Sequence, residues 1–109
     1  MSSDRVVITG IGVVSSIGKT REAFWESCLA GRSGTVRLDN PGVVDTDIAT
    51  KIAAPIRDFD PVAAGIPSRE VSILDGTTWF ALAAGHEALE DAGFRLPPRS
   101  EVAGRRARG

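Results

Sequence analysis

The chain has 109 residues, of which 42% are apolar and 25% charged, and its formal net charge is −1. This composition is typical of one soluble globular domain and excludes collagen-like and low-complexity chains. No apolar run approaches the roughly 20 residues of a membrane-spanning helix. The N-terminus lacks a basic region followed by an apolar core, so no secretory signal is predicted. With one cysteine and one histidine, neither an internal disulfide nor a zinc site can form. We expect a cytoplasmic protein without metal or cofactor.

The charge is distributed unevenly along the chain. Residues 1–94 carry 8 basic and 13 acidic side chains, whereas residues 95–109 carry five arginines and one glutamate. The acidic body argues against a nucleic-acid-binding face. The segment 95–109 contains no aromatic residue and little aliphatic surface, so we expect a disordered tail rich in arginine, proline and alanine.

The first predicted element is a strand over Arg5–Thr9. Its apolar residues are consecutive and β-branched, a pattern typical of parallel strands buried on both faces. Gly10 and Gly12 follow directly, and two glycines so spaced predict a tight turn or a close approach to another backbone.

A helix is predicted next, with Thr20 as N-cap and Gly31 just beyond its end. Phe24, Cys28 and Leu29 share one face of this helix. We expect Cys28 to be a small buried hydrophobe rather than a nucleophile, because the C-terminal end of a helix dipole disfavours a thiolate.

Residues 32–70 form an irregular middle, rich in turn residues. Lys51–Ile56 is predicted as a short edge strand, since Pro55 cannot donate to a ladder. Asp58–Pro61 is predicted as a turn.

The clearest predicted element is a long alanine-rich helix from Leu74 or Asp75 to Ala92, with Gly93 beyond it. Its apolar positions cover much of the circumference, so the helix needs covering on more than one side. Its alanines allow a neighbouring backbone to approach closely. These alanines are Ala81, Ala83, Ala84 and Ala88.

The polar residues of this helix have simple structural interpretations. His86 is expected to be a packed or half-exposed histidine, because the sequence has no second histidine to pair with it. Glu87, Glu90 and Asp91 are interpreted as a solvated face.

A nucleotide site is a weak alternative for the segment Gly12–Thr20. A phosphate loop needs four residues between its first glycine and Gly-Lys-Thr, whereas five separate Gly12 from Gly18. Asp75 could imitate a metal-binding carboxylate after a strand, but it also fits a helix start. A dinucleotide fingerprint starting at Gly10 lacks its third glycine.

Four blocks of the sequence, in order, resemble β-ketoacyl-acyl carrier protein synthases. They cover residues 5–94. The blocks are the opening Arg5–Gly18, the helix ending in Leu-Ala-Gly-Arg-Ser-Gly at Phe24–Gly34, the turn region Ala53–Pro61 and the alanine-rich helix Leu74–Gly93.

The resemblance implies an α/β class of fold, here an incomplete N-terminal portion of the thiolase-like fold: strand, glycine turn, helix, irregular middle and long helix. Members of this family are acyltransferases that condense a cysteine-bound acyl chain with malonyl-acyl carrier protein, usually as homodimers, in fatty-acid or polyketide synthesis. In the family the nucleophile and two histidines lie beyond the matched blocks. No catalytic, cofactor-binding or metal-binding residue is therefore assigned, and neither Cys28 nor His86 matches a catalytic position.

We therefore expect an N-terminal fragment of a β-ketoacyl synthase, inactive and poorly folded alone, with acyl carrier protein and a second subunit as partners of the whole enzyme. The alternative is a non-catalytic ketosynthase-like partner subunit. The composition switch after residue 94 leads to the hypothesis that the tail is read in a shifted frame or that the gene is truncated. A divergent natural terminus is the other interpretation.

Overall fold

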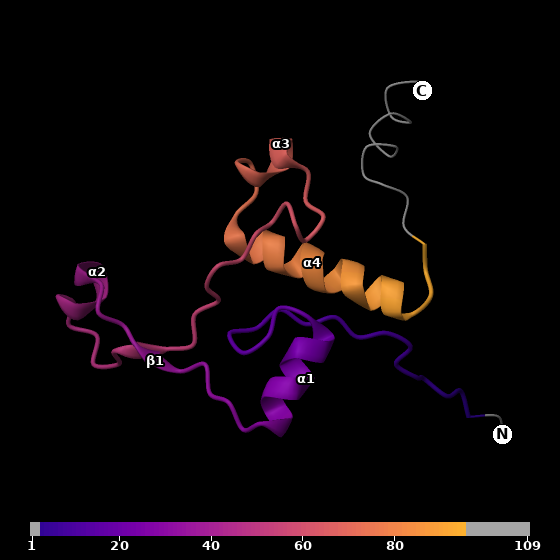
Figure 1. The fold of residues 1–109 in the computed structure, drawn as a ribbon, viewed down its shortest axis with the longest axis horizontal. Coiled ribbons are helices and arrows are strands. Elements are labelled where there is room, and N and C mark those ends of the chain that lie inside the picture. The colour runs from indigo at the N-terminus through magenta and orange to yellow at the C-terminus, as the bar shows by residue number, and fades with distance from the viewer. Residues whose placement is uncertain (1–2, 96–109) are drawn as a thin grey trace. The chain divides into compact units, whose positions relative to one another are not determined.

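The computed structural model describes residues 3–95. Its elements in chain order are α1 (Arg21–Leu29), β1 (Val36–Arg37), α2 (Pro41–Val44), β2 (Ile52–Ala53), α3 (Ser68–Val71) and α4 (Gly76–Asp91), which Figure 1 labels where there is room. They belong to two compact units. One unit comprises residues 14–59, and the other combines residues 1–13 with residues 60–109. The described residues are partly helical and contain two short strands of two residues each. The predicted tail lies almost wholly outside the described residues and stays a prediction.

Helix α1 confirms the prediction from its capping residues. The Thr20 hydroxyl accepts a hydrogen bond from the Ala23 amide at 3.2 Å, which satisfies one of the amides that a helix start leaves unpaired. After the last turn, Gly31 adopts a φ of +67°, the left-handed conformation that glycine tolerates best. The residue that α1 buries is Ser27, whose hydroxyl donates to the Ile17 carbonyl at 2.6 Å. This bond fixes α1 to the loop before it.

The irregular middle contains more structure than predicted. Strand β2 lies inside the predicted edge strand Lys51–Ile56, and it pairs antiparallel with β1, with Val36 opposite Ala53 and Arg37 opposite Ile52. The turn-rich segment after β1 becomes the single-turn helix α2, which begins at a proline, because a proline at the first helical position sacrifices no hydrogen bond. Helix α3 was not predicted. Such short elements carry no periodicity that a sequence can display.

Helix α4 agrees closely with the predicted long helix. Asp75 is its N-cap, and its Oδ1 accepts from the Thr78 amide at 2.8 Å. Gly93 follows the helix with a φ of +88°.

The predicted turn at Asp58–Pro61, which precedes α3, extends into a turn over residues 61–65. Asp60 Oδ1 accepts hydrogen bonds there from the amides of Val62 and Ala63.

The cap of α4 makes the stability of this helix depend on pH. Hydrogen bonds from the side chain and the backbone of Thr78 lower the pKa of Asp75. Because the folded pKa is depressed, the stabilisation is present above the unfolded value and is lost as pH falls through the folded one. Helical circular dichroism should therefore fall as pH is lowered below about 4. Asp75→Asn, which keeps a capping oxygen, should reduce that fall. An unchanged acid transition in this variant would contradict the assignment.

The prediction of a strand over Arg5–Thr9 is wrong. Among the described residues, 3–14 belong to no helix or strand, and the side chains of Val6, Val7 and Ile8 are 96%, 71% and 82% exposed. A parallel strand needs a neighbouring strand to accept and donate its ladder hydrogen bonds. No such neighbour lies in residues 60–95 of the same unit, where the regular elements are α3 and α4.

The two glycines after this segment confirm the prediction of a close backbone approach. A Cβ on Gly10 would overlap the Ala88 carbonyl oxygen, and one on Gly12 would overlap the Ala84 carbonyl oxygen. Two strand residues advance by about 6.6 Å, and four helical residues advance by about 6 Å. Glycines two apart can therefore follow alanines four apart along α4, beside which this segment runs in Figure 1.

Two carboxylates of α4 hold the same segment. The Ile11 amide donates to Asp91 Oδ2 at 3.0 Å, and the Val13 amide donates to Glu87 Oε2 at 2.9 Å. The interpretation of Glu87 and Asp91 as a solvated face is incomplete: Asp91 is exposed and Glu87 is half-buried, and both carboxylates also accept hydrogen bonds from the backbone. Residues 10–13, here called the strap, are thus attached to α4 by apposed small residues and by charge-assisted hydrogen bonds.

Candidate functional site

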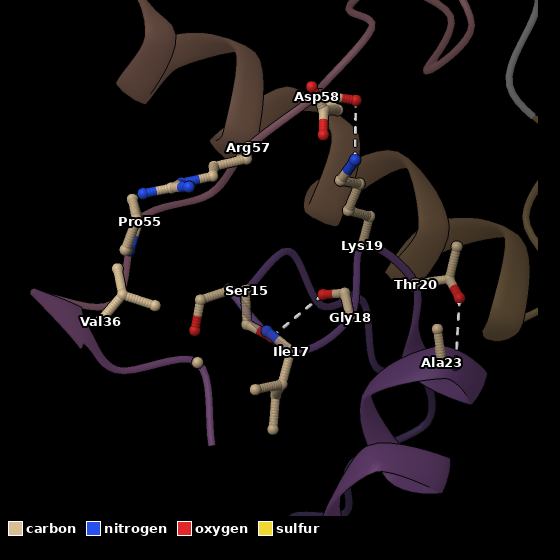
Figure 2. Close-up of a pocket in the computed structure, with 12 residues that line it drawn as sticks. Ser15, Ile17, Gly18, Lys19, Thr20, Ala23, Val36, Pro55, Arg57 and Asp58 are labelled. Carbon is tan, nitrogen blue, oxygen red and sulfur yellow. Dashed lines mark hydrogen bonds between the residues drawn. The ribbon is translucent and has the colours of Figure 1, made fainter. Parts of the chain in front are cut away.

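The candidate site is a pocket of about 580 Å3 within the unit of residues 14–59. Three stretches of chain form its walls: the loop 15–20 with the first turn of α1, the approach to β1 at Gly34 and Val36, and the segment 55–58 after β2. Figure 2 shows these residues around the cavity. The β1–β2 pairing brings the second and third walls together, because it fixes residue 36 opposite residue 53.

The loop in the first wall is a tight turn that uses its own polar groups. The Ser15 amide donates to the Gly18 carbonyl at 2.8 Å, and the Gly18 amide returns a bond to the Ser15 carbonyl at 3.4 Å. The Ser15 hydroxyl accepts from the Ile17 amide at 3.3 Å. A phosphate loop needs its amides free and converging on the ligand. These three amides are occupied, which argues against the nucleotide alternative.

The remaining features of that alternative also have structural roles. The Thr20 hydroxyl, which would face a magnesium ion in a phosphate loop, caps α1. The Asp75 carboxylate caps α4. The motif-like residues of the sequence are thus explained by helix starts and by a turn.

Lys19 connects the first wall to the third. Its Nζ lies 2.7 Å from the carbonyl oxygen of Asp58, and Figure 2 shows this bond at one end of the pocket. Asp58 has a φ of +54°, a left-handed conformation that aspartate tolerates better than most residues. Arg57 precedes it on the same wall and is exposed.

The pocket is lined by charged and hydroxyl-bearing side chains, and neither Cys28 nor His86 is among its lining residues. Its titratable wall residues are Lys19, Arg57 and Asp58, with neither a cysteine nor a histidine among them. The thiol of Cys28 is exposed, so the prediction of a buried Cys28 is wrong; Ser27 takes the inward position instead. His86 is half-exposed, as expected, and its Nε2 lies 3.0 Å from Glu90 Oε1.

The sequence did not predict a functional role for several of these residues. Arg57 lies between the predicted edge strand Lys51–Ile56 and the predicted turn Asp58–Pro61, so no prediction concerns it. The partner of Lys19 is a backbone carbonyl, which leaves no signature in the sequence. For the strap a signal existed: positions 84, 87, 88, 91 and 92 form one helical stripe of small and acidic residues. A stripe of that kind indicates a face that accepts backbone.

Residues 3–95 contain no helix with both the length and the hydropathy to cross a bilayer. In the same range, no three side chains of the metal-ligating types come together.

Comparison with known proteins gives one consistent relationship. Residues 3–106 match the protein family described as the β-ketoacyl synthase N-terminal domain. Over 96 residues the chain is 36% identical to 3-oxoacyl-[acyl-carrier-protein] synthase 2 of Coxiella burnetii and 33% identical to that of Vibrio harveyi, covering 88% of this chain and 22% of each relative. It is 40% identical over 92 residues to the tetracenomycin polyketide synthase ketoacyl synthase alpha subunit of Streptomyces glaucescens, covering 83% of this chain and 20% of the relative. The chain therefore spans about a fifth of the length of these curated relatives.

Proposed function

Because the chain belongs to the β-ketoacyl synthase family, we propose that it supplies the N-terminal part of an enzyme that condenses an acyl thioester with malonyl-acyl carrier protein. The observation that carries this proposal is the family match over residues 3–106. Relatives in fatty-acid and polyketide synthesis both align over most of the chain. Acyl carrier protein and a second copy of the enzyme are the proposed partners of the whole protein.

Within that enzyme, we assign residues 3–95 the role of scaffold. The matched residues include a capped helix, a strap seated on a second helix and a tight turn, and each has a structural partner of its own. Cys28 is exposed and His86 is bonded to Glu90, which supports a nucleophile and a base outside these two residues. The condensing groups are therefore proposed to lie in the part of the relatives that this chain does not match.

Two features of the unit containing α4 support a scaffold that other segments complete. Val6, Val7 and Ile8 expose a continuous apolar run, which costs free energy in water unless another layer covers it. The indole Nε1 of Trp79 is buried and has no hydrogen-bond partner among the described residues, although buried donors are normally satisfied. Both features are expected of one part of a larger core.

The experiment that tests the proposal is a chimera. The matched 96-residue segment of the Coxiella burnetii synthase is replaced by the corresponding segment of this chain. If the segment is an interchangeable scaffold, elongation of an acyl-acyl carrier protein with malonyl-acyl carrier protein, followed by mass spectrometry, should remain within about tenfold of the parent rate.

Two controls accompany the chimera. The 109-residue chain alone should give no elongated product, and the chimera carrying Gly12→Val should lose soluble expression because its strap cannot seat. A soluble, folded chimera without condensing activity would contradict the scaffold role. Elongation by the chain alone would contradict the placement of the catalytic groups elsewhere.

A further inference from the structure

The pocket in the unit of residues 14–59 carries an excess of positive charge. Its lining includes two cationic side chains, Lys19 and Arg57, and a single carboxylate, that of Asp58. Neither cation takes part in an ion pair with another of the described residues 3–95. The chain outside the tail is acidic, with 13 acidic and 8 basic side chains in residues 1–94. Two unpaired cations at one cavity are therefore a local exception.

The Lys19 ammonium is held in place without being neutralised. Its bond to the Asp58 carbonyl oxygen, 2.7 Å long, uses one of three ammonium donors and meets a neutral acceptor. The full positive charge and two donors thus remain available at the pocket. The left-handed backbone of Asp58 presents this carbonyl, so the position of Lys19 depends on the backbone of Asp58 and does not need its carboxylate.

Arg57 completes the cationic side of the pocket. It stands on the third wall, and Figure 2 shows its guanidinium extending beside Pro55. A guanidinium presents paired N–H donors that match the oxygens of a phosphate or carboxylate. The lining also includes the apolar side chains of Ile17, Ala23 and Val36, of which Val36 lies beside Pro55 in Figure 2. The pocket therefore combines an anion-recognising side with a surface suited to an apolar group.

We propose that this pocket binds a small organic oxyanion, a phosphate monoester or carboxylate with an apolar body, through Lys19 and Arg57. The oxyanion is bound by side-chain cations, because the turn occupies the amides of Ser15, Ile17 and Gly18. A volume of about 580 Å3 lies within the range of small-molecule sites. Binding at this pocket does not require the condensing reaction.

The test is a titration of the full 109-residue chain at low ionic strength, where a charged site is screened least. Phenyl phosphate, benzoate and inorganic phosphate are added in turn, and the amide resonances of residues 15–20 are followed by NMR. We expect saturable shifts with phenyl phosphate, and weaker binding of inorganic phosphate, because it leaves the apolar wall unused. The absence of saturable shifts with every probe would overturn the proposal.

Three variants show whether the charges of this pocket are responsible. Arg57→Gln keeps the Lys19–Asp58 bond and removes one positive charge. The dissociation constant should rise about fivefold, because that factor corresponds to the attraction between two unit charges about 4 Å apart in water. Asp58→Asn keeps the backbone carbonyl and tolerates the left-handed conformation; by removing the opposing carboxylate it should strengthen binding by a similar factor. Arg69→Gln, on α3 in the other unit, should change nothing. Equal weakening by Arg57→Gln and Arg69→Gln, or weaker binding in Asp58→Asn, would overturn the assignment.

Discussion

Gly12→Val is expected to unfold the unit built on α4. The new Cβ would overlap the Ala84 carbonyl oxygen and lie 2.8 Å from the Ala88 nitrogen. These atoms belong to the helix backbone and cannot move aside as a flexible side chain would. We expect the variant to lose about 3 kcal/mol or more of unfolding free energy. The described core of this unit has one buried apolar residue, Ile66, so a loss of that size should abolish its folded state.

Gly85→Ala is the matched control on the same helix. Gly85 lies in the interior of α4, is exposed, and would place its Cβ within 4 Å of nothing. Because alanine is the better helix former, this variant should gain about 1 kcal/mol. Urea unfolding followed by the fluorescence of Trp79, in a Trp25→Phe background, measures both variants. If Gly12→Val retains the unfolding free energy of the wild type, the strap does not lie on α4 as described.

Removing the two carboxylates that hold the strap is the second large effect. The double variant Glu87→Ala, Asp91→Ala should lose about 2–3 kcal/mol, because hydrogen bonds to charged groups contribute about 1.5–3 kcal/mol each when well formed and these two are partly exposed. Glu87→Gln should lose less unfolding free energy than Glu87→Ala, because the amide oxygen of glutamine can still accept a hydrogen bond from the Val13 amide. Urea unfolding read by the same fluorescence is the measurement.

Glu90→Ala provides the comparison for this pair. Glu90 lies on the same helix, but its partner is the half-exposed His86 side chain rather than the strap. An exposed pair of this kind contributes at most about 0.5 kcal/mol. Equal destabilisation by Glu90→Ala and Glu87→Ala would mean that helix charge, and not strap binding, determines the stability.

The sequence predicted the elements that are stabilised by local interactions. The caps at Thr20 and Asp75 and the terminal glycines at Gly31 and Gly93 act within a few residues of the chain, so their residue types identify α1 and α4 directly. Gly10 and Gly12 predicted a close backbone approach for a similar reason. Glycine has no Cβ, and this property is evident from the sequence even when the neighbouring backbone is unknown. The family resemblance rested on the same blocks and is confirmed.

The tertiary structure decided what depends on residues distant in sequence. Arg5–Thr9 has the composition of a buried strand, but strand formation requires a neighbouring ladder, and residues 60–95 of its unit supply a helix instead. The acidic stripe of α4 shows its role only when the Ile11 and Val13 amides, 80 and 74 residues away along the chain, come within hydrogen-bond distance. The pocket likewise exists because β1 pairs with β2. The type of a residue determines its preference for local geometry and burial. Which group then pairs with a backbone amide or a charge depends on the tertiary structure, because the partner can be distant in the sequence.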